Sequence, residues 1–206
     1  MNREIRAFSF EVRAEQNEEH GNHLVGTPIV YGSKTDLGWY DEVIEEGALD
    51  GTDLKDVRFL VNHNVEMIPL ARSRNNNANS TMQLMVVPTE GMNIRVDLDV
   101  ENNAEAKSLY SAVARGDLDG MSFMFSVDAD SWDDLESDHP TRHIRSIGRV
   151  FEVSAVTFPA YSDTSIQARG ISETLESARE SLESAKAEQR RIEQQKHKIK
   201  ILTEVY

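Results

Sequence analysis

The sequence predicts an α+β protein that is mainly β and that ends in a long C-terminal helix. Short apolar segments with period-two alternation recur through the first 170 residues, separated by Gly, Asn, Asp and Pro. One internal segment instead has helical periodicity, and residues 172–202 contain neither Gly nor Pro. We therefore expect a folded domain over residues 1–169 and an amphipathic helix over residues 170–206.

The individual elements follow from these patterns. Residues 103–116 predict a helix, with Asn103 as N-cap, Glu105 in the first turn and Gly116 at the C-terminal stop. Residues 73–80, SRNNNANS, are typical of an exposed loop. Seven segments are predicted as strands: 6–12, 24–32, 57–63, 81–87, 93–100, 121–127 and 149–158.

The C-terminal segment has a seam of residues at three-four spacing that includes Leu175, Ala178, Leu182 and Ile192. Gln189 interrupts this seam, as does a lysine seven positions later. Two interpretations stay open: a short self-paired coiled coil, or a single helix that packs on the domain or on a partner.

Charge and composition exclude several classes of function. The chain has 206 residues, no cysteine and a net charge of −14. Disulfides, zinc thiolate sites and a cysteine nucleophile are therefore excluded. Residues 171–206 carry equal numbers of acidic and basic residues, so the whole negative excess lies in the first 170 and disfavours nucleic-acid binding. No apolar run approaches the roughly 18 residues that span a membrane.

Five of the six histidines give no convincing site. His20 and His23 lie in one acidic loop, and His139 and His143 in another. Their spacings would suit a metal on a helix, but neither pair lies in a predicted helix or has a third ligand nearby. His197 lies among lysines on the C-terminal helix. We therefore predict solvated histidines, no metal site and no cofactor.

Three other polar residues are in apolar surroundings. His63 ends an apolar strand, where it either faces a cleft or caps a turn. Ser122 lies two residues after Gly120, inside the predicted strand MSFMFSV. It is either a nucleophile or a minor polar position in the strand. Glu152 lies inside VFEVSAVTF, either solvated on an edge strand or orienting another group. Ser126 and Ser154 are the alternatives to Ser122 as a serine nucleophile.

A serine, a histidine and a carboxylate make a set for nucleophilic catalysis. A serine hydroxyl is hardly ionised at neutral pH, so it needs a base such as imidazole to take its proton. A third group holds the ring in the correct tautomer and favours the imidazolium. Gly120 would let the chain turn before Ser122, so that backbone amides point at a developing oxyanion, with Arg145 or Arg149 assisting through a water.

Several motifs together resemble one known family. They are VGTPIVYGS (25–33), WYDEVIEEGAL (39–49), VRFLVNHN (57–64), IPLARS (68–73), ARGDLDGMSFMF (114–125) and VFEVSAVTFPAYSDTSI (150–166). In this order they resemble the prohead (head maturation) serine proteases of tailed bacteriophages, which are related in fold to the herpesvirus assemblins. The similarity covers about residues 3–169.

The resemblance implies a fold, a site and a role. The fold is an assemblin-like β-barrel with packed helices. His63 falls on the catalytic histidine, Ser122 on the nucleophile, and Glu152 on the acidic third member, a position that a histidine fills in the herpesvirus relatives. The implied activity is a serine endopeptidase that processes capsid and scaffold proteins during head maturation and also cuts itself.

The resemblance also implies partners and a location. The partners are the major capsid protein and the scaffold, and the herpesvirus relatives make self-association as a dimer an expectation. Neither nucleic acid nor membrane is expected as a partner. The enzyme would act in the host cytoplasm, inside the immature procapsid. The C-terminal helix resembles a scaffold-like or targeting element, with residues 165–173 as a trimming region.

Two alternatives stay open at this point. The domain could be a non-enzymatic capsid assembly or scaffold module, in which case Ser122→Ala changes nothing. It could also be another serine hydrolase that acts on small esters. The absence of a Gly-x-Ser-x-Gly elbow between a parallel strand and a helix argues against the common hydrolase fold.

Overall fold

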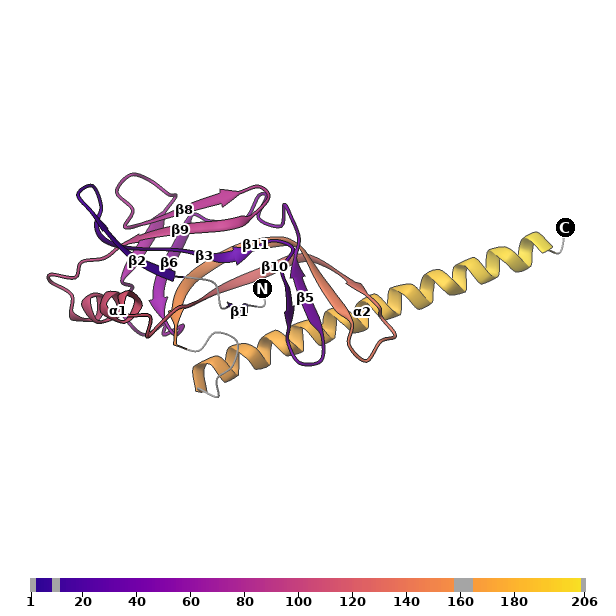
Figure 1. Cartoon of the computed structure of the whole chain (residues 1–206). Coiled ribbons are helices and arrows are strands. Elements are labelled where there is room, and N and C mark those ends of the chain that lie inside the picture. The colour runs from indigo at the N-terminus through magenta and orange to yellow at the C-terminus, as the bar shows by residue number, and fades with distance from the viewer. Residues whose placement is uncertain (1–2, 9–11, 158–164, 205–206) are drawn as a thin grey trace.

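The structure is a computed structural model, which describes residues 3–8, 12–157 and 165–204. Two β-sheets pack against each other and a long helix extends from one side of them (Figure 1). The larger sheet has seven strands and the smaller has four. The mainly β prediction with a long C-terminal helix is confirmed. The two sheets are open, so the word barrel describes them only loosely.

The larger sheet is built around a hairpin of two long strands, β10 (Gly120–Asp133) and β11 (Thr141–Val156). β1 (Glu4–Phe8) pairs antiparallel with β10 on the outer side of this hairpin. On the other side, the first part of β11 pairs with β5 and its last part pairs with β6, both in parallel. The sheet is completed by β4 (Lys34–Asp36), β5 (Asp41–Ile44), β6 (Asp56–Val61) and β7 (Ala71–Arg74).

The smaller sheet covers one face of the larger. Its strands, in the order β2-β3-β9-β8, are β2 (Val12–Asn17), β3 (Gly21–Val30), β9 (Gly91–Asp97) and β8 (Met82–Val87). Residues from both sheets form a single apolar core, in which Ile29 and Ile94 of the smaller sheet share a cluster with Phe123 and Val153 of the larger. Burying these side chains supplies the main driving force for folding.

The helix α1 (Ala104–Ala114) closes one end of the core. Asn103 caps it as predicted, because its side-chain oxygen accepts hydrogen bonds from the backbone N–H groups of Glu105 and Ala106. Its apolar face, including Leu109 and Val113, is buried in the core. The chain then runs through Gly116 directly into β10.

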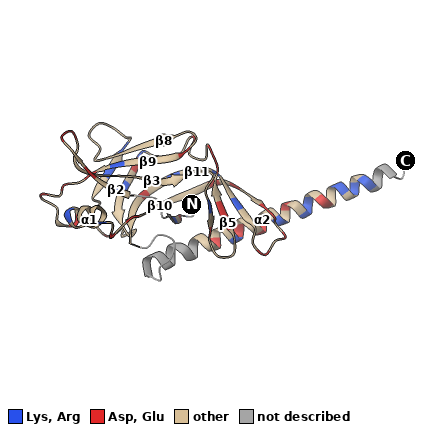
Figure 2. Ribbon diagram, in the orientation of Figure 1, with Lys and Arg blue, Asp and Glu red and all other residues tan. Residues whose placement is uncertain are grey.

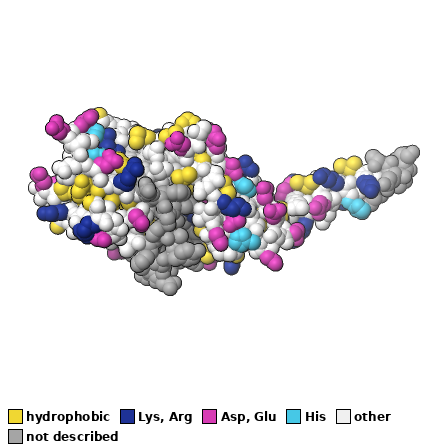
Figure 3. Space-filling model, viewed as in Figure 1, with side chains coloured by type: hydrophobic (Ala, Val, Ile, Leu, Met, Phe, Trp, Pro, Cys, Tyr) yellow, Lys and Arg dark blue, Asp and Glu magenta, His cyan; other side chains and the backbone are white. Residues whose placement is uncertain are grey.

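The helix α2 (Ser165–Glu204) has a docked part and a projecting part. In the docked part, Ala178 and Leu182 are buried against Tyr40 and Trp132. Beyond this contact the helix projects from the domain, and it changes from mainly acidic to mainly basic along its length (Figures 2 and 3). Ile192 is 41% exposed. Of the two open interpretations of the C-terminal helix, packing on the domain therefore applies to its first half.

Most predicted elements lie close to observed ones, and the differences have physical causes. The predicted strand 6–12 falls on both β1 and β2, and its residues 9–11 lie outside the described part. The predicted loop 73–80 begins inside β7. The short strands β4, β5 and β7 were missed because three or four residues give too little alternation. Within the described residues, none of the helices combines the length and apolarity that a membrane span requires.

Candidate active site

His63 lies in a tight turn that follows β6. Asn62 and His63 both have positive φ, at 51° and 56°, a conformation that costs free energy unless its surroundings impose it. The end of β11 imposes it here: the Asn62 N–H donates to the carbonyl of Ala155, and the Asn62 side chain bonds to Thr157. The His63 side chain, which could have faced a cleft or capped an exposed turn, is thereby directed inward and buried.

Ser122 lies in the middle of β10. It is opposite Ala7 of β1 on one side and opposite Ser154 of β11 on the other. Its side chain is fully buried, and its Oγ is 2.5 Å from Nε2 of His63. Ser122 is therefore held by backbone pairing on both sides and contacts the imidazole directly.

Glu152 lies on the central strand β11 and is 3% exposed. The interpretation as a solvated residue on an edge strand is therefore wrong. One carboxylate oxygen is 2.5 Å from Nδ1 of His63, and the other accepts a 2.5 Å hydrogen bond from the Ser154 hydroxyl. The Ser154 Oγ also accepts a hydrogen bond from the His63 backbone N–H at 3.1 Å. Ser154, which by sequence was an alternative nucleophile, therefore bonds to both His63 and Glu152 and helps to hold them in place.

These contacts form a continuous chain from Ser122 through His63 to Glu152. Each ring nitrogen of His63 contacts one oxygen, so the carboxylate at Nδ1 fixes Nε2 as the nitrogen that points at the serine. This is the arrangement in which imidazole can take the serine proton and the carboxylate can stabilise the resulting imidazolium. The structure therefore brings together all three residues that the sequence singled out.

The prediction of a turn just before Ser122 is wrong. Gly120 is the first residue of β10 and pairs with Val156, so the chain is extended there. The regular backbone hydrogen bonding with β11 keeps Gly120 extended, although glycine could adopt a turn conformation. The two arginines considered as helpers have other partners: the Arg145 guanidinium donates to Ser131 Oγ, and that of Arg149 lies by Asp53.

A buried network of charges next to the site was missed by the sequence analysis. Arg6 of β1 and Arg142 of β11 both pair with Glu4 and Glu42, and all four side chains are buried. Burial alone would raise the pKa of Glu4, but Arg6 and Arg142 together lower it below its ordinary value. Nothing in the sequence pairs Arg6 with residues so far along the chain.

Few of the described residues are arranged to hold a metal ion. Asp36, Asp41 and His139 have ligand atoms within 4.8 Å of one another, at the partly exposed edge of β4 and β5. Lys34 donates to Asp41 at 3.0 Å, so this group is already partly neutralised. The prediction of solvated loop histidines is wrong for His23, which lies in β3 and is buried beside Glu15, with its ring 5.9 Å from that of His20. His143 lies in β11 and contacts Glu45.

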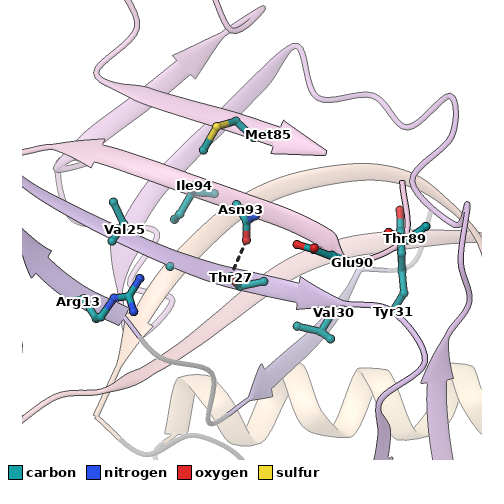
Figure 4. Close-up of a pocket in the computed structure, with 11 residues that line it drawn as sticks. Arg13, Val25, Thr27, Val30, Tyr31, Met85, Thr89, Glu90, Asn93 and Ile94 are labelled. Carbon is teal, nitrogen blue, oxygen red and sulfur yellow. Dashed lines mark hydrogen bonds between the residues drawn. The ribbon is translucent and has the colours of Figure 1, made fainter. Parts of the chain in front are cut away.

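A hollow of about 710 Å³ lies over the smaller sheet, away from this site. Its lining includes Arg13, Met85 and Glu90, and in its floor Thr27 donates a 2.6 Å hydrogen bond to Asn93 (Figure 4). It contains none of His63, Ser122 and Glu152. The chemistry-bearing residues are instead closed off from solvent.

A hydroxyl, an imidazole and a carboxylate in hydrogen-bonded order on a β scaffold are the arrangement that serine hydrolases use. Comparison with protein families narrows this class. Residues 8–177 match the model of the caudovirus prohead serine proteases, and the chain belongs to this family. No curated protein and no solved structure matches the chain.

Membership of this family makes the chain a serine protease of phage head maturation. It associates with phage capsid components and has its place inside the procapsid in the host cell. The matched region extends into the docked half of α2, as far as Ser177. The division into residues 1–169 and 170–206 stays a prediction.

Proposed function

We propose that this chain is a serine endopeptidase that cuts capsid and scaffold proteins inside the immature phage head, with Ser122 as nucleophile, His63 as general base and Glu152 as the group that orients His63. The observation that carries this proposal is the unbroken contact chain, with 2.5 Å between Ser122 Oγ and His63 Nε2 and 2.5 Å between His63 Nδ1 and Glu152.

The chemistry follows from these contacts. Ser122 Oγ attacks the carbonyl carbon of the substrate peptide while His63 Nε2 takes the hydroxyl proton. The same proton then passes to the leaving amine nitrogen, the C–N bond breaks, and an acyl ester remains on Ser122. Water, deprotonated by His63, hydrolyses this ester and restores the serine hydroxyl. Glu152 holds the ring in place and stabilises the imidazolium.

Self-processing is part of the same proposal. Residues 165–173 are helical, and a protease cuts extended chain, so cleavage there requires the first turns of α2 to unwind. We therefore expect self-cleavage at this junction to be slow in the isolated chain and faster once α2 is displaced.

The test compares the intact chain with Ser122→Ala, each alone and each with the phage's own capsid protein, by intact-mass measurement over time. We expect the intact chain to shorten the capsid protein and itself, and Ser122→Ala to leave both unchanged. Equal behaviour of the two chains with assembled capsid protein would contradict the proposal.

One observation favours a second candidate, a non-enzymatic assembly module. Ser122 is fully buried, as a serine that serves only the fold would be. The same test separates the two candidates, because an assembly module incorporates equally with either residue at position 122 and leaves every mass unchanged.

A further inference from the structure

The strand β1 lies where a substrate would have to lie. Among the described strands β1 pairs with β10 alone, so it is the terminal strand of the sheet on the nucleophile's side. Its register places Arg6 opposite Phe123 and Ala7 opposite Ser122. The Ser122 hydroxyl donates a 2.6 Å hydrogen bond to the backbone carbonyl of Arg6. A peptide carbonyl therefore already occupies the position next to the nucleophile.

The hydrogen bond to Arg6 also uses the Ser122 hydroxyl proton, which catalysis must transfer to His63. A serine hydroxyl has one proton, and the Arg6 carbonyl can only accept a hydrogen bond. With its proton directed at Arg6, the Ser122 hydroxyl does not direct that proton at His63 Nε2, which lies 2.5 Å away and must take it in catalysis. The docked strand thus opposes catalysis as well as excluding a substrate.

The edge of β10 suits a peptide in extended conformation. The opposite edge of β10 pairs with β11 along its length, so only the β1 side can present a substrate carbonyl to Ser122. Peptides commonly bind by adding a strand to a free sheet edge, with backbone hydrogen bonds supplying affinity. Removing β1 would leave residues 121–125 of β10 as such an edge.

The helix α2 holds β1 in this place. The Ile5 N–H donates to Thr174 Oγ1 at 3.1 Å, and the Ser177 hydroxyl donates to the buried carboxylate of Glu4 at 2.9 Å. Figure 1 shows α2 running past β1 and β10 before it projects from the domain. The outer side of β1 thus meets α2 rather than solvent or another strand.

We propose that β1 occupies the substrate peptide's place along β10, that α2 holds it there, and that the intact chain cuts only in those molecules in which this contact is transiently released. The inference rests on the proposed function, since it assigns the substrate-binding edge of the same site. The substrate it implies is an extended peptide segment that pairs antiparallel with residues 121–125.

The test weakens the contact from both sides. Thr174→Val with Ser177→Ala removes the two helix hydroxyls, and Ile5→Pro removes the strand N–H that bonds Thr174. Ser184→Ala is the matched control, because the hydroxyl of this exposed serine donates to the carbonyl of Glu180 in its own helix. Modification of Ser122 by an alkyl fluorophosphonate is followed by intact mass, and hydrogen exchange reports whether β1 and β10 separate.

We expect both release variants to be modified at least tenfold faster than the wild-type chain and the control, with lost amide protection in residues 4–8 and 121–125. Equal modification rates in all chains would overturn the inference while leaving the nucleophile assignment intact. Separation of β1 with Ser122 still unmodified would overturn the proposed function, and the inference with it.

A second measurement tests whether β1 and substrate share one place. A synthetic peptide with the sequence of residues 3–8, REIRAF, is added to the double variant during cleavage of capsid protein. We expect it to raise KM and leave kcat unchanged, whereas a scrambled peptide has no effect. Inhibition that lowers kcat at unchanged KM, or no inhibition, would overturn the shared place.

Discussion

At the scale of single residues, Ser154 is the support on which the site geometry depends. Its hydroxyl donates to the Glu152 carboxylate and accepts from the backbone N–H of His63. Glu152 and His63 come from segments 89 positions apart in the chain, and Ser154 bonds to both. A buried hydroxyl with two partners restricts the carboxylate to one orientation.

We therefore expect Ser154→Ala to lower kcat by about 10- to 100-fold, because losing a hydrogen bond to a charged group costs about 1.5–3 kcal/mol. The free energy of unfolding should fall by about 1–3 kcal/mol, since two buried groups lose their partner. Peptide cleavage kinetics and urea unfolding measure the two effects.

Ser126→Ala is the matched control for this prediction. Ser126 lies on β10 and is buried like Ser154, but its hydroxyl has no hydrogen-bond partner among the described residues. Its loss should leave kcat unchanged and stability within about 0.5 kcal/mol, because no bond is broken. An equal loss of kcat in both variants would contradict the positioning role of Ser154.

At the scale of elements, the turn after β6 decides where His63 lies. Asn62 tolerates positive φ better than most residues, and its side chain also bonds to Thr157. Asn62→Ala should reduce stability by about 2–3 kcal/mol, about 1 from the backbone conformation and the rest from lost hydrogen bonds. It should also lower kcat, because the ring of His63 loses its fixed approach to Ser122.

Asn75→Ala separates these two effects. Asn75 has φ of 50°, close to the 51° of Asn62, but lies in the turn after β7, away from the site. The substitution should cost about 1 kcal/mol through the same backbone preference and leave kcat unchanged. Urea unfolding and steady-state kinetics on the two variants measure this. Unchanged kcat in Asn62→Ala would contradict the role of the turn.

The buried charge network makes the attachment of β1 depend on pH. The pKa of Glu4 is lowered in the fold, where the attraction of Arg6 and Arg142 outweighs burial. Its contribution to stability is therefore present above the ordinary pKa of 4.5 and is lost as the pH falls through the lower folded value. We expect the free energy of unfolding to decrease from about pH 4.5 downward.

Glu4→Gln should flatten this decrease, because an amide does not titrate. At pH 7 the variant should be less stable by about 1–3 kcal/mol, since two buried arginines lose part of their pairing. Glu66→Gln, at an exposed position, is the control and should keep the wild-type dependence. Urea unfolding between pH 7 and 3 measures all three chains. The same acid dependence in Glu4→Gln would contradict the assignment to Glu4.

How much of this could be predicted depends on the range of the interactions. The strand character of residues 121–127 in β10 and 149–156 in β11 and the N-cap of α1 are local, so the alternation and Asn103 predicted them. The first half of β11 was missed, and His143 in it was interpreted as a loop residue. The grouping of His63, Ser122 and Glu152 was predicted by the family resemblance rather than by their spacing. The pairing of β1 with β10 was missed, because residues 6–12 alternate regularly and were interpreted as one strand. A contact across 116 positions, from Arg6 to Ser122, has no local signal.

At the scale of the whole molecule, the question is which part of α2 belongs to the folded domain. Ala178 and Leu182 are buried against Tyr40 and Trp132, whereas residues 187–200 of the helix are all exposed. The family match ends within the docked part, at residue 177. The two halves of one helix should therefore contribute very differently to stability.

Truncation after Lys186 should change Tm by no more than about 1 °C, because it removes exposed surface. Truncation after residue 173 uncovers the apolar cluster of Tyr40 and Trp132 and releases the outer contacts of β1. Losing the burial of one leucine and one alanine and the exposure of their partners should cost about 3–4 kcal/mol, or about 5–15 °C in Tm. Trp39 and Trp132 stack 5.9 Å apart beside α2, so tryptophan fluorescence follows the transition directly. Equal Tm values for the two truncations would mean that the docked half adds nothing to the fold, and α2 could not then hold β1 over Ser122.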